Sequence, residues 1–323
     1  MKNSVKTLFL RIDGYGFFNL VFGTARWFVV LLMRKIYSEK KLKRRIYDFE
    51  MYLDIFDDGL SKQLIKYKKR ELDHKYILEK VLNPGFTVLD IGANIGYYTL
   101  IEKQLTGESG KIIAVEPSPT NIELLKINAE LNDFKNIKIF QATISSHSGK
   151  KDFFLSYESN LNTFHNYGSV ESHLTGETIE VDTYTVPEIL REASYEKLDL
   201  IRMDVEGHEV DVIEGMLEQI ADETLLPSII FETHISRYNE ENNMRNILKQ
   251  LFSHGYQAKY VASSWQKGSS IIQSKGYQPL LTIPTDGVRR AIYEDIGNED
   301  AEDLICNTGG IRTVYLKHQS TKS

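Results

Sequence analysis

Short apolar runs rich in Ile, Val and Leu alternate along the chain with segments whose apolar residues recur every three to four positions. The helical spacing is clear over residues 121–131 and 209–220. Alternating strands and helices are typical of a parallel sheet that helices cover on both faces. The pattern therefore predicts a doubly wound, mostly parallel α/β sheet. The expected strands are residues 87–90, 111–116, 137–140, 198–204, 228–232, 257–262 and 312–316.

Residues 1–46 do not follow this alternation. Between residues 14 and 33 the only charged side chain is Arg26, and the basic run 34–45 follows. A membrane-spanning helix is not expected, because a central arginine is costly in a bilayer, and the layout of a signal peptide is missing. Two interpretations stay open. The segment is a helical arm packed on the body or on the second subunit of a homodimer, or it is an amphipathic helix on an anionic membrane surface.

A second irregular segment, residues 263–311, separates the last two expected strands. It is too long for a hairpin loop, so we expect it to fold as an insertion that caps the body and binds the acceptor. Its aromatic residues Trp265, Tyr277 and Tyr293 either stack on sugar rings or pack the insertion onto the body. The predicted organisation is an arm over 1–46 and one domain over 47–323.

Charge is distributed unevenly along the 323 residues. The net charge of −6 argues against a protein that coats nucleic acid. Residues 1–70 nevertheless hold 16 Lys and Arg against 7 Asp and Glu, net +9, which leaves 23 against 38 in the rest, net −15. The single cysteine, Cys306, excludes an intrachain disulfide and a cysteine zinc site. A cytoplasmic location is expected, peripheral at the inner membrane face if the arm binds lipid.

The sequence VLDIGANIGYYT begins at Val88 and combines an apolar strand with a glycine-rich turn. Such a turn belongs at the ligand-binding edge of an open α/β sheet. Gly92 and Gly96 allow the backbone to approach a ligand, and Asn94 is a side chain that tolerates left-handed backbone geometry. The turn therefore predicts a binding site for a nucleoside-containing ligand or, more simply, a structural tight turn.

Glu116 favours the ligand, because it ends the next expected strand 24 residues after Gly92. A carboxylate there accepts hydrogen bonds from both hydroxyls of a ribose. The turn lacks the full glycine pattern of dinucleotide sites, and Asp90 would oppose a pyrophosphate. A cationic sulfonium with an amino group suits that carboxylate better, so S-adenosylmethionine is preferred over NAD.

Ionisable residues follow two later strands. Asp204, Glu206 and His208 come at the end of the strand 198–204, and Glu232 and His234 end the next strand. Charged groups this dense at strand ends are costly to desolvate, which favours a functional role. For His208 alone, a solvated position at the start of a helix is an equal alternative.

These segments resemble the FkbM family of S-adenosylmethionine-dependent methyltransferases. The resemblance rests on VLDIGANIGYYTL, on VEPSP from Val115, on RMDVEGHE from Arg202, and on the lead-in from Met51 to Glu71. It covers residues 51–262 and implies a class I methyltransferase fold, a Rossmann-like sheet of seven strands. The family usually has Lys-Ile where this chain has Arg202-Met203, which keeps the charge but not a lysine-specific role.

The resemblance also implies a role for each matching residue. Asp90, Gly92, Asn94 and Gly96 would hold the methionine end of the cofactor, Glu116 its ribose, Ala142 and Thr143 its adenine, and Asp204 and Glu206 would face the methyl group and the acceptor.

The reaction implied by the family is mainly O-methylation, with a saccharide hydroxyl, in a glycan or on a lipid, as the expected acceptor. Removing the hydroxyl proton needs a base, for which Asp204 is preferred over Glu232 and His234. No metal is required by the spacing, although Mg²⁺ held by these carboxylates is an alternative. Two rival functions stay open, a non-catalytic binding module on the same fold and an NAD-dependent enzyme.

Overall fold

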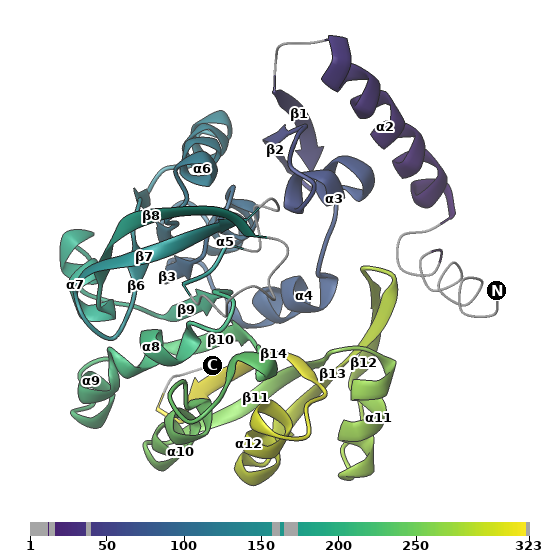
Figure 1. Ribbon diagram of the computed structural model, residues 1–323. Helices are drawn as coiled ribbons and strands as arrows, with labels where there is room; N and C mark the ends of the chain where they lie inside the picture. The colour runs from purple at the N-terminus through teal and green to yellow at the C-terminus, as the bar shows by residue number, and fades with distance from the viewer. Residues whose placement is uncertain (1–11, 13–16, 37–39, 157–161, 165–173, 321–323) are drawn as a thin grey trace.

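Figure 1 shows the computed structural model, which describes residues 12, 17–36, 40–156, 162–164 and 174–320. A nine-stranded sheet lies at its centre. All seven expected strands belong to this sheet. They are β3 (Thr87–Ile91), β4 (Lys111–Val115), β5 (Ile137–Phe140), β9 (Leu200–Met203), β10 (Ser228–Glu232), β11 (Tyr256–Ser263) and β14 (Ile311–His318), and the other two are β12 (Leu281–Thr285) and β13 (Val288–Ile296).

The strand order is β12-β13-β11-β14-β10-β9-β3-β4-β5. β10, β9, β3, β4 and β5 are parallel, whereas β14 is antiparallel to both of its neighbours. The chain first builds β3, β4 and β5 toward one edge and then returns to add β9 and β10 on the other side of β3. The predicted doubly wound, mostly parallel sheet is confirmed, with two more strands than expected.

The two additional strands come from the insertion, residues 263–311. β13 pairs with β11 and β12 pairs with β13, so the insertion extends the edge of the main sheet. Two helices accompany these strands. Tyr293 is fully buried and its hydroxyl donates to the carbonyl oxygen of Ser269, so for this residue the packing interpretation holds. Trp265 is 53% exposed. The helices are α11 (Gln266–Ser274) and α12 (Asn298–Cys306).

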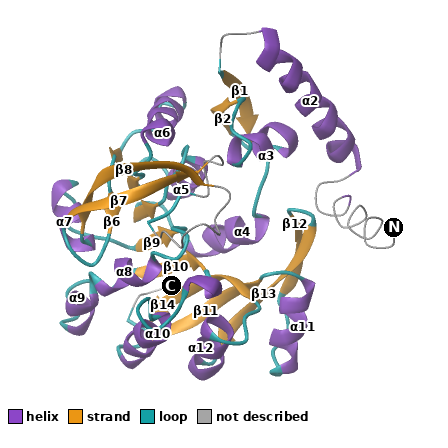
Figure 2. Cartoon of the chain, in the orientation of Figure 1, coloured by secondary structure: helices purple, strands orange, loops and turns teal. Residues whose placement is uncertain are grey.

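Helices cover both faces of the sheet, as Figure 2 shows. The strand β3 shows why both faces need cover. Its neighbouring residues Val88 and Leu89 are both buried, but they belong to two different apolar clusters. A strand buried on both faces reads as a continuous apolar run. Val88 shares its cluster with residues of α3 (Leu60–Tyr67), α4 (Leu72–Val81), α5 (Tyr97–Thr106) and α6 (Pro119–Leu131), and Leu89 shares its own with α7 (Val186–Glu192), α8 (Glu209–Glu214), α9 (Leu217–Ala221), α10 (Met244–Ser253), α11 and α12.

The predicted helix 209–220 is interrupted, because α8 ends before Gly215 and α9 follows it. A Cβ atom at Gly215 would lie 2.5 Å from the carbonyl oxygen of Ser145. This close approach lets the loop after β6 (Thr143–Ile144) pass directly over the helix break. β6 belongs to a small sheet with β7 (Gly149–Ser156) and β8 (Leu174–Tyr184), which the sequence pattern did not predict.

The N-terminal segment contains the helix α2 (Phe17–Ile36) and the hairpin of β1 (Lys41–Ile46) and β2 (Phe49–Asp54). α2 lies beside α3 at the periphery of the molecule (Figure 1). The hairpin packs on the body, because Asn128 of α6 and Asn132 directly after it accept hydrogen bonds from the backbone of β2. The expected boundary of the arm, at residue 46, falls between the two strands of this hairpin. No helix within the described ranges is long and apolar enough to cross a bilayer.

Candidate active site

The strand order reverses between β3 and β9, and ligands of open α/β sheets bind at such a point. Both strands end there in loops that touch. A Cβ atom at Gly92 would lie 2.4 Å from the carbonyl oxygen of Asp204, and Gly92 has a φ of +74°. Asn94 follows with a φ of +50°, which confirms the left-handed backbone expected of it. Only glycine fits at position 92, so the two loops meet without an intervening side chain.

Two cavities open on either side of this contact, and both are lined by Gly92, Asn94 and Asp204. Including the space that is open to solvent, the first measures about 430 Å³ and the second about 400 Å³. The first is also lined by Glu116, Thr143, Phe153, Asn162, Phe164 and Glu206, and the second by Leu60, Arg70, Glu71, Tyr97, Tyr98 and Arg202.

Glu116 reaches the first cavity from the end of β4 and is 3% exposed. One carboxylate oxygen accepts from the backbone N–H of Asn94 at 2.9 Å, and the other accepts from the backbone N–H of Ser118 at 2.9 Å. Burial raises the pKa of Glu116 to about 7, although these donors favour the ionised form. The side chain is thus fixed against the glycine-rich turn.

Asp90 lies beneath the turn and lines neither cavity. Its carboxylate is fully buried and accepts from the hydroxyl of Thr99 at 2.6 Å and from Arg202 at 3.2 Å. Arg202 also donates to the carbonyl oxygen of Gly92 and lies 4.2 Å from the ring centre of Tyr98. Asp90 therefore fixes the turn through Arg202. It does not face the cavities, although the resemblance in the sequence places it at the methionine end of the cofactor.

The remaining cofactor residues predicted from the sequence divide into two groups. Thr143 lines the first cavity, next to Glu116. Among the described residues that line the two cavities, neither Ala142 nor Gly96 is found. Ala142 is 2% exposed and packs in the core, and Gly96 precedes α5, where a Cβ atom would lie 2.6 Å from Leu125. Their positions indicate a structural contribution to the site.

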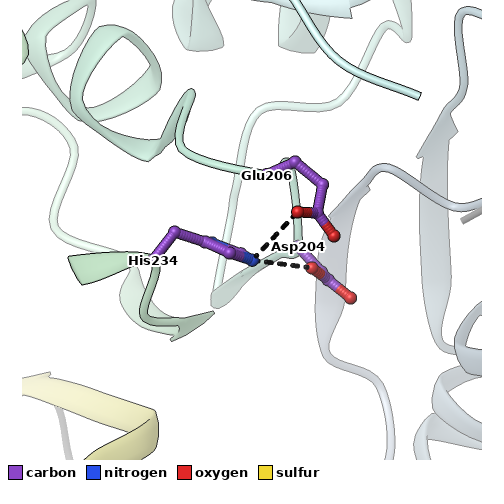
Figure 3. Close-up of side chains that lie close together, drawn as sticks. All are labelled: Asp204, Glu206 and His234. Atoms are coloured by element: carbon purple, nitrogen blue, oxygen red, sulfur yellow. Dashed lines mark ion pairs between the residues drawn. The ribbon is translucent and has the colours of Figure 1, made fainter. Parts of the chain in front are cut away.

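Asp204, Glu206 and His234 point toward one another at the edge of the sheet (Figure 3). The imidazole Nε2 of His234 lies 3.9 Å from Asp204 Oδ1 and 3.7 Å from Glu206 Oε2. Burial raises the pKa of Glu206 to about 7, and His234 opposes this rise. The expected convergence of the two strand ends is therefore present in the structure.

Glu209 holds His234 from behind. Its carboxylate is fully buried and lies 2.8 Å from Nδ1 of His234, which leaves Nε2 directed at the other two carboxylates. Burial alone would lower the pKa of His234, but Glu209 and its other acidic neighbours raise it to about 10. At neutral pH His234 is thus an imidazolium among carboxylates.

Glu232 is separated from this group by an ion pair with Arg312 of β14, at 2.5 Å. Burial raises the pKa of Glu232 to about 8, against the opposing effect of Arg312. Arg312 also contacts Glu71 of the second cavity at 2.7 Å. Glu232 is therefore tied to a neighbouring strand, whereas Asp204, whose ion pair with Arg202 is longer at 3.6 Å, lines both cavities.

Asp204, Glu206 and His234 are also the one group of three such side chains in the described part of the chain that lie close enough together to hold a metal ion. Each offers one ligand atom, and these atoms all lie within 4.8 Å of one another. Oxygen and imidazole nitrogen are suitable ligands for a divalent cation. A metal would displace the proton of His234, because only a neutral imidazole nitrogen can ligate.

Several residues of the site were not singled out in the sequence, although Arg70 and Tyr98 lie within the segments that carry the family resemblance. Phe153 lies on β7, and Phe164 lies in the described stretch 162–164. Their rings are 4.6 Å apart, and both line the first cavity. Arg70 and Tyr98 line the second cavity, where both contact Glu71. Aromatic residues on a half-exposed strand look like ordinary packing positions, so only the spatial arrangement brings them to the site.

The family model of the FkbM methyltransferase domain matches residues 90–258, which contain the turn, Glu116 and the Asp204 group. The chain belongs to this FkbM methyltransferase family. The resemblance noted in the sequence is confirmed, and methyl transfer from S-adenosylmethionine is the reaction class. A model of protein-L-isoaspartate(D-aspartate) O-methyltransferases matches residues 33–145.

Two relatives in sequence carry the names of methyltransferases. Methyltransferase sdnD of Sordaria araneosa is 28% identical over 195 residues, covering 52% of this chain and 73% of that protein. The 2-O-methyltransferase NoeI of Sinorhizobium fredii is 28% identical over 176 residues, covering 51% and 70%. Among solved structures, M. jannaschii TYW2 in complex with AdoMet has a TM-score of 0.38 at 14% identity, covering 80% of this chain and 89% of that one.

Proposed function

We propose that this FkbM protein methylates a hydroxyl group of a saccharide, with Asp204 as the base. The observation that carries the proposal is the position of Asp204 at the junction of two cavities. One cavity has the groups that suit adenosine, and the other has the groups that suit an amino acid. The Asp204 carboxylate is therefore next to the place where a transferred methyl group would lie.

The first cavity fits the adenosine part of S-adenosylmethionine. Glu116 Oε2 accepts one backbone hydrogen bond and keeps a lone pair for a ribose hydroxyl, whereas Oε1 accepts a backbone hydrogen bond and a longer one from the Asn121 amide, which a second ribose hydroxyl can replace. Phe153 and Phe164 offer aromatic faces beside Thr143 for a planar base. These contacts support the predicted ribose role of Glu116 and add two aromatic residues to the predicted adenine contacts.

The second cavity fits the amino-acid end of the cofactor. Arg70 lines it with a guanidinium group whose side chain is 12% exposed, a suitable partner for a carboxylate. The carboxylates of Glu71 and Asp204 line the same cavity and suit an ammonium group and a sulfonium. The sequence-based role of Asp90 is taken over in this proposal by Asp204 and Arg70.

When bound, S-adenosylmethionine supplies a methyl group that its sulfonium activates for in-line displacement by the acceptor oxygen. The oxygen–carbon bond forms as the carbon–sulfur bond breaks, and the hydroxyl proton passes to Asp204. Glu206 and His234 face Asp204 and position it, and Glu209 fixes the ring of His234. Glu232 is the second choice as base because Arg312 holds its carboxylate.

An oxygen acceptor is supported by the relative NoeI, whose name is that of a 2-O-methyltransferase. The acceptor must reach Asp204 from the side that the cofactor leaves open. The turn between β12 and β13 comes close to this side, since Asp286 accepts from the backbone N–H of Glu71. We therefore assign acceptor recognition to the insertion, with a saccharide as the substrate class.

Calorimetry with S-adenosylhomocysteine and with NAD tests the cofactor. Binding of S-adenosylhomocysteine alone is the expected result, and Glu116→Ala should weaken it at least about tenfold, because two charge-assisted hydrogen bonds are lost. Binding of NAD instead, or of neither compound, would contradict the proposal.

Turnover of Asp204→Asn tests the base. Transfer of a labelled methyl group to saccharides extracted from the source cells should fall roughly 10²- to 10⁴-fold, a much larger loss than that of the affinity for S-adenosylhomocysteine, for which Asp204 is one of several contacts. Asp295→Asn is the matched control, because Asp295 pairs with Lys259 on the surface and is 62% exposed. Full activity of Asp204→Asn would exclude Asp204 as the base.

A further inference from the structure

The outer face of α2 exposes a large apolar surface. Of the twelve large hydrophobic side chains that are exposed among the described residues, eight belong to this helix. They lie between Phe17 and Leu32 and have exposed fractions of 40% to 73%. Phe18, at 73%, and Phe28, at 62%, are the most exposed of them. An apolar surface of this size on one helix indicates a binding partner.

The inner face of the same helix is fixed to the body. A Cβ atom at Gly23 would lie 2.8 Å from the carbonyl oxygen of Lys66, to which the Arg26 guanidinium also donates at 2.8 Å. Val30 is 2% exposed, and Arg34 donates to the carbonyl oxygen of Ile55 at 2.5 Å. The body therefore presents the outer face of α2 in a defined direction.

The shape of the apolar face favours a membrane over a helical partner. At about 100° per residue, its eight positions cover roughly half of the helix circumference. Dimerising helices usually meet along a narrow seam, whereas a helix lying in a bilayer surface buries a wide face. With 20 residues, α2 is about 30 Å long and provides a correspondingly extended contact.

The charge next to this face complements an anionic surface. Residues 17–70 hold 13 Lys and Arg against 6 Asp and Glu, net +7, in a chain whose net charge is −6. α2 contains no acidic residue, and Lys35, Lys40, Lys41 and Lys43 after its apolar face are all exposed. The ion pairs that Lys41 and Lys43 form are surface pairs, which lipid phosphates can replace at little cost.

We propose that α2 docks the protein on an anionic membrane surface. The apolar face enters the boundary between headgroups and acyl chains, and the lysines that follow it contact lipid phosphates. The partner is a lipid surface and not a second copy of the chain. This inference concerns where the protein acts and does not depend on which acceptor it methylates.

Co-sedimentation with phosphatidylcholine vesicles, with and without phosphatidylglycerol, tests the docking. The full-length chain should bind the anionic vesicles and lose this binding as salt is added. The double variant Phe18→Glu/Phe28→Glu should weaken it at least about tenfold, because it replaces two aromatic side chains that enter the bilayer with charged ones. Leu280→Glu is the matched control, since Leu280 is 47% exposed outside α2 and its variant should bind like the wild type.

Size-exclusion chromatography with light scattering separates the alternatives. A wild-type dimer that the double variant converts to a monomer, together with no vesicle binding, would assign the face to a second copy and overturn the proposal. Vesicle binding unaffected by the double variant would also overturn it. Retained affinity for S-adenosylhomocysteine shows that the variant is folded and keeps this test separate from that of the proposed function.

Discussion

Glu116 combines full burial with a position where a ligand hydroxyl would need an ionised acceptor. Its pKa of about 7 exceeds the ordinary value of 4.5, so the folded chain binds this proton more tightly than the unfolded chain. Between these two pH values, ionisation of Glu116 thus costs stability as the pH rises. In the proposed function a bound ribose would offset this cost, because its hydroxyls would donate to the carboxylate.

The affinity for S-adenosylhomocysteine should therefore depend on pH. Below pH 7 a proton competes with the ribose, and we expect the Kd to rise by up to about tenfold per pH unit. Calorimetry across this range measures the slope. Glu116→Gln should bind weakly at every pH, without the slope. Glu206→Gln is the control that keeps it, because Glu206 lines the same cavity with a similar pKa. A wild-type slope in Glu116→Gln would assign the titration to another group.

At the scale of the elements, the turn between β3 and α5 shows why particular glycines matter. Gly92 and Gly107 flank α5, and both have a positive φ, +74° and +69°. A Cβ atom at Gly107 would meet nothing within 4 Å, whereas at Gly92 it would collide with the backbone of Asp204. A side chain would strain the backbone at both positions, but only at position 92 would it also collide with another loop.

Gly92→Ala and Gly107→Ala therefore separate strain from contact. Each should lose about 1 to 3 kcal/mol of unfolding free energy from its positive φ. Gly92→Ala should lose about 2 kcal/mol more, because the loops after β3 and β9 must move apart, and its binding of S-adenosylhomocysteine should be lost. Urea unfolding and calorimetry measure both effects. Equal behaviour of the two variants would show that the loop contact does not organise the site.

The hairpins show which elements the sequence pattern misses. The seven predicted strands of the main sheet appear as apolar runs, whereas its other two strands, β12 and β13 of the insertion, are partly exposed and were not predicted. β1 reads KLKRRI and is exposed at every second residue, so its charged positions obscured the strand. β7 and β8 are similarly half-exposed. Pairing with a partner strand, and not burial of the segment alone, defines these elements.

At the scale of the whole molecule, buried ion pairs connect the insertion to the lead-in of the domain. Arg290 of β13 is 6% exposed and donates to Asp73 at 3.0 Å and to Asp286 at 2.9 Å. Asp73, 217 positions earlier, is fully buried. Glu71, two residues before it, pairs with Arg312 of β14. These pairs hold the wall of the second cavity against the end of the sheet.

Arg290→Ala should destabilise the protein by about 3 to 5 kcal/mol, because it leaves the buried carboxylate of Asp73 without its partner. Arg245→Ala provides a matched comparison, since Arg245 is 41% exposed and its pair with Glu302 should contribute less than about 1 kcal/mol. Urea unfolding of the three proteins measures the difference. Similar losses in both variants would mean that the insertion is not tied to the body through Arg290.

The sequence by itself determined the sheet and the motifs at its edge. Gly92, Asn94, Glu116 and Asp204 could be located because each stands in a fixed relation to a strand end, and strand ends follow from local apolar patterns. For the same reason the family could be recognised from short motifs within residues 51–262.

Only the tertiary structure decided which of the candidate residues line the cavities and which are held by other side chains. Asp90 and Glu232 are engaged by Arg202 and Arg312, partners 112 and 80 positions away, whereas Asp204 faces the cavities. Likewise the aromatic wall and the arm boundary depend on contacts between distant segments. Such contacts leave no periodic trace in the chain, because a buried charge selects its partner by position in space and not by spacing in sequence.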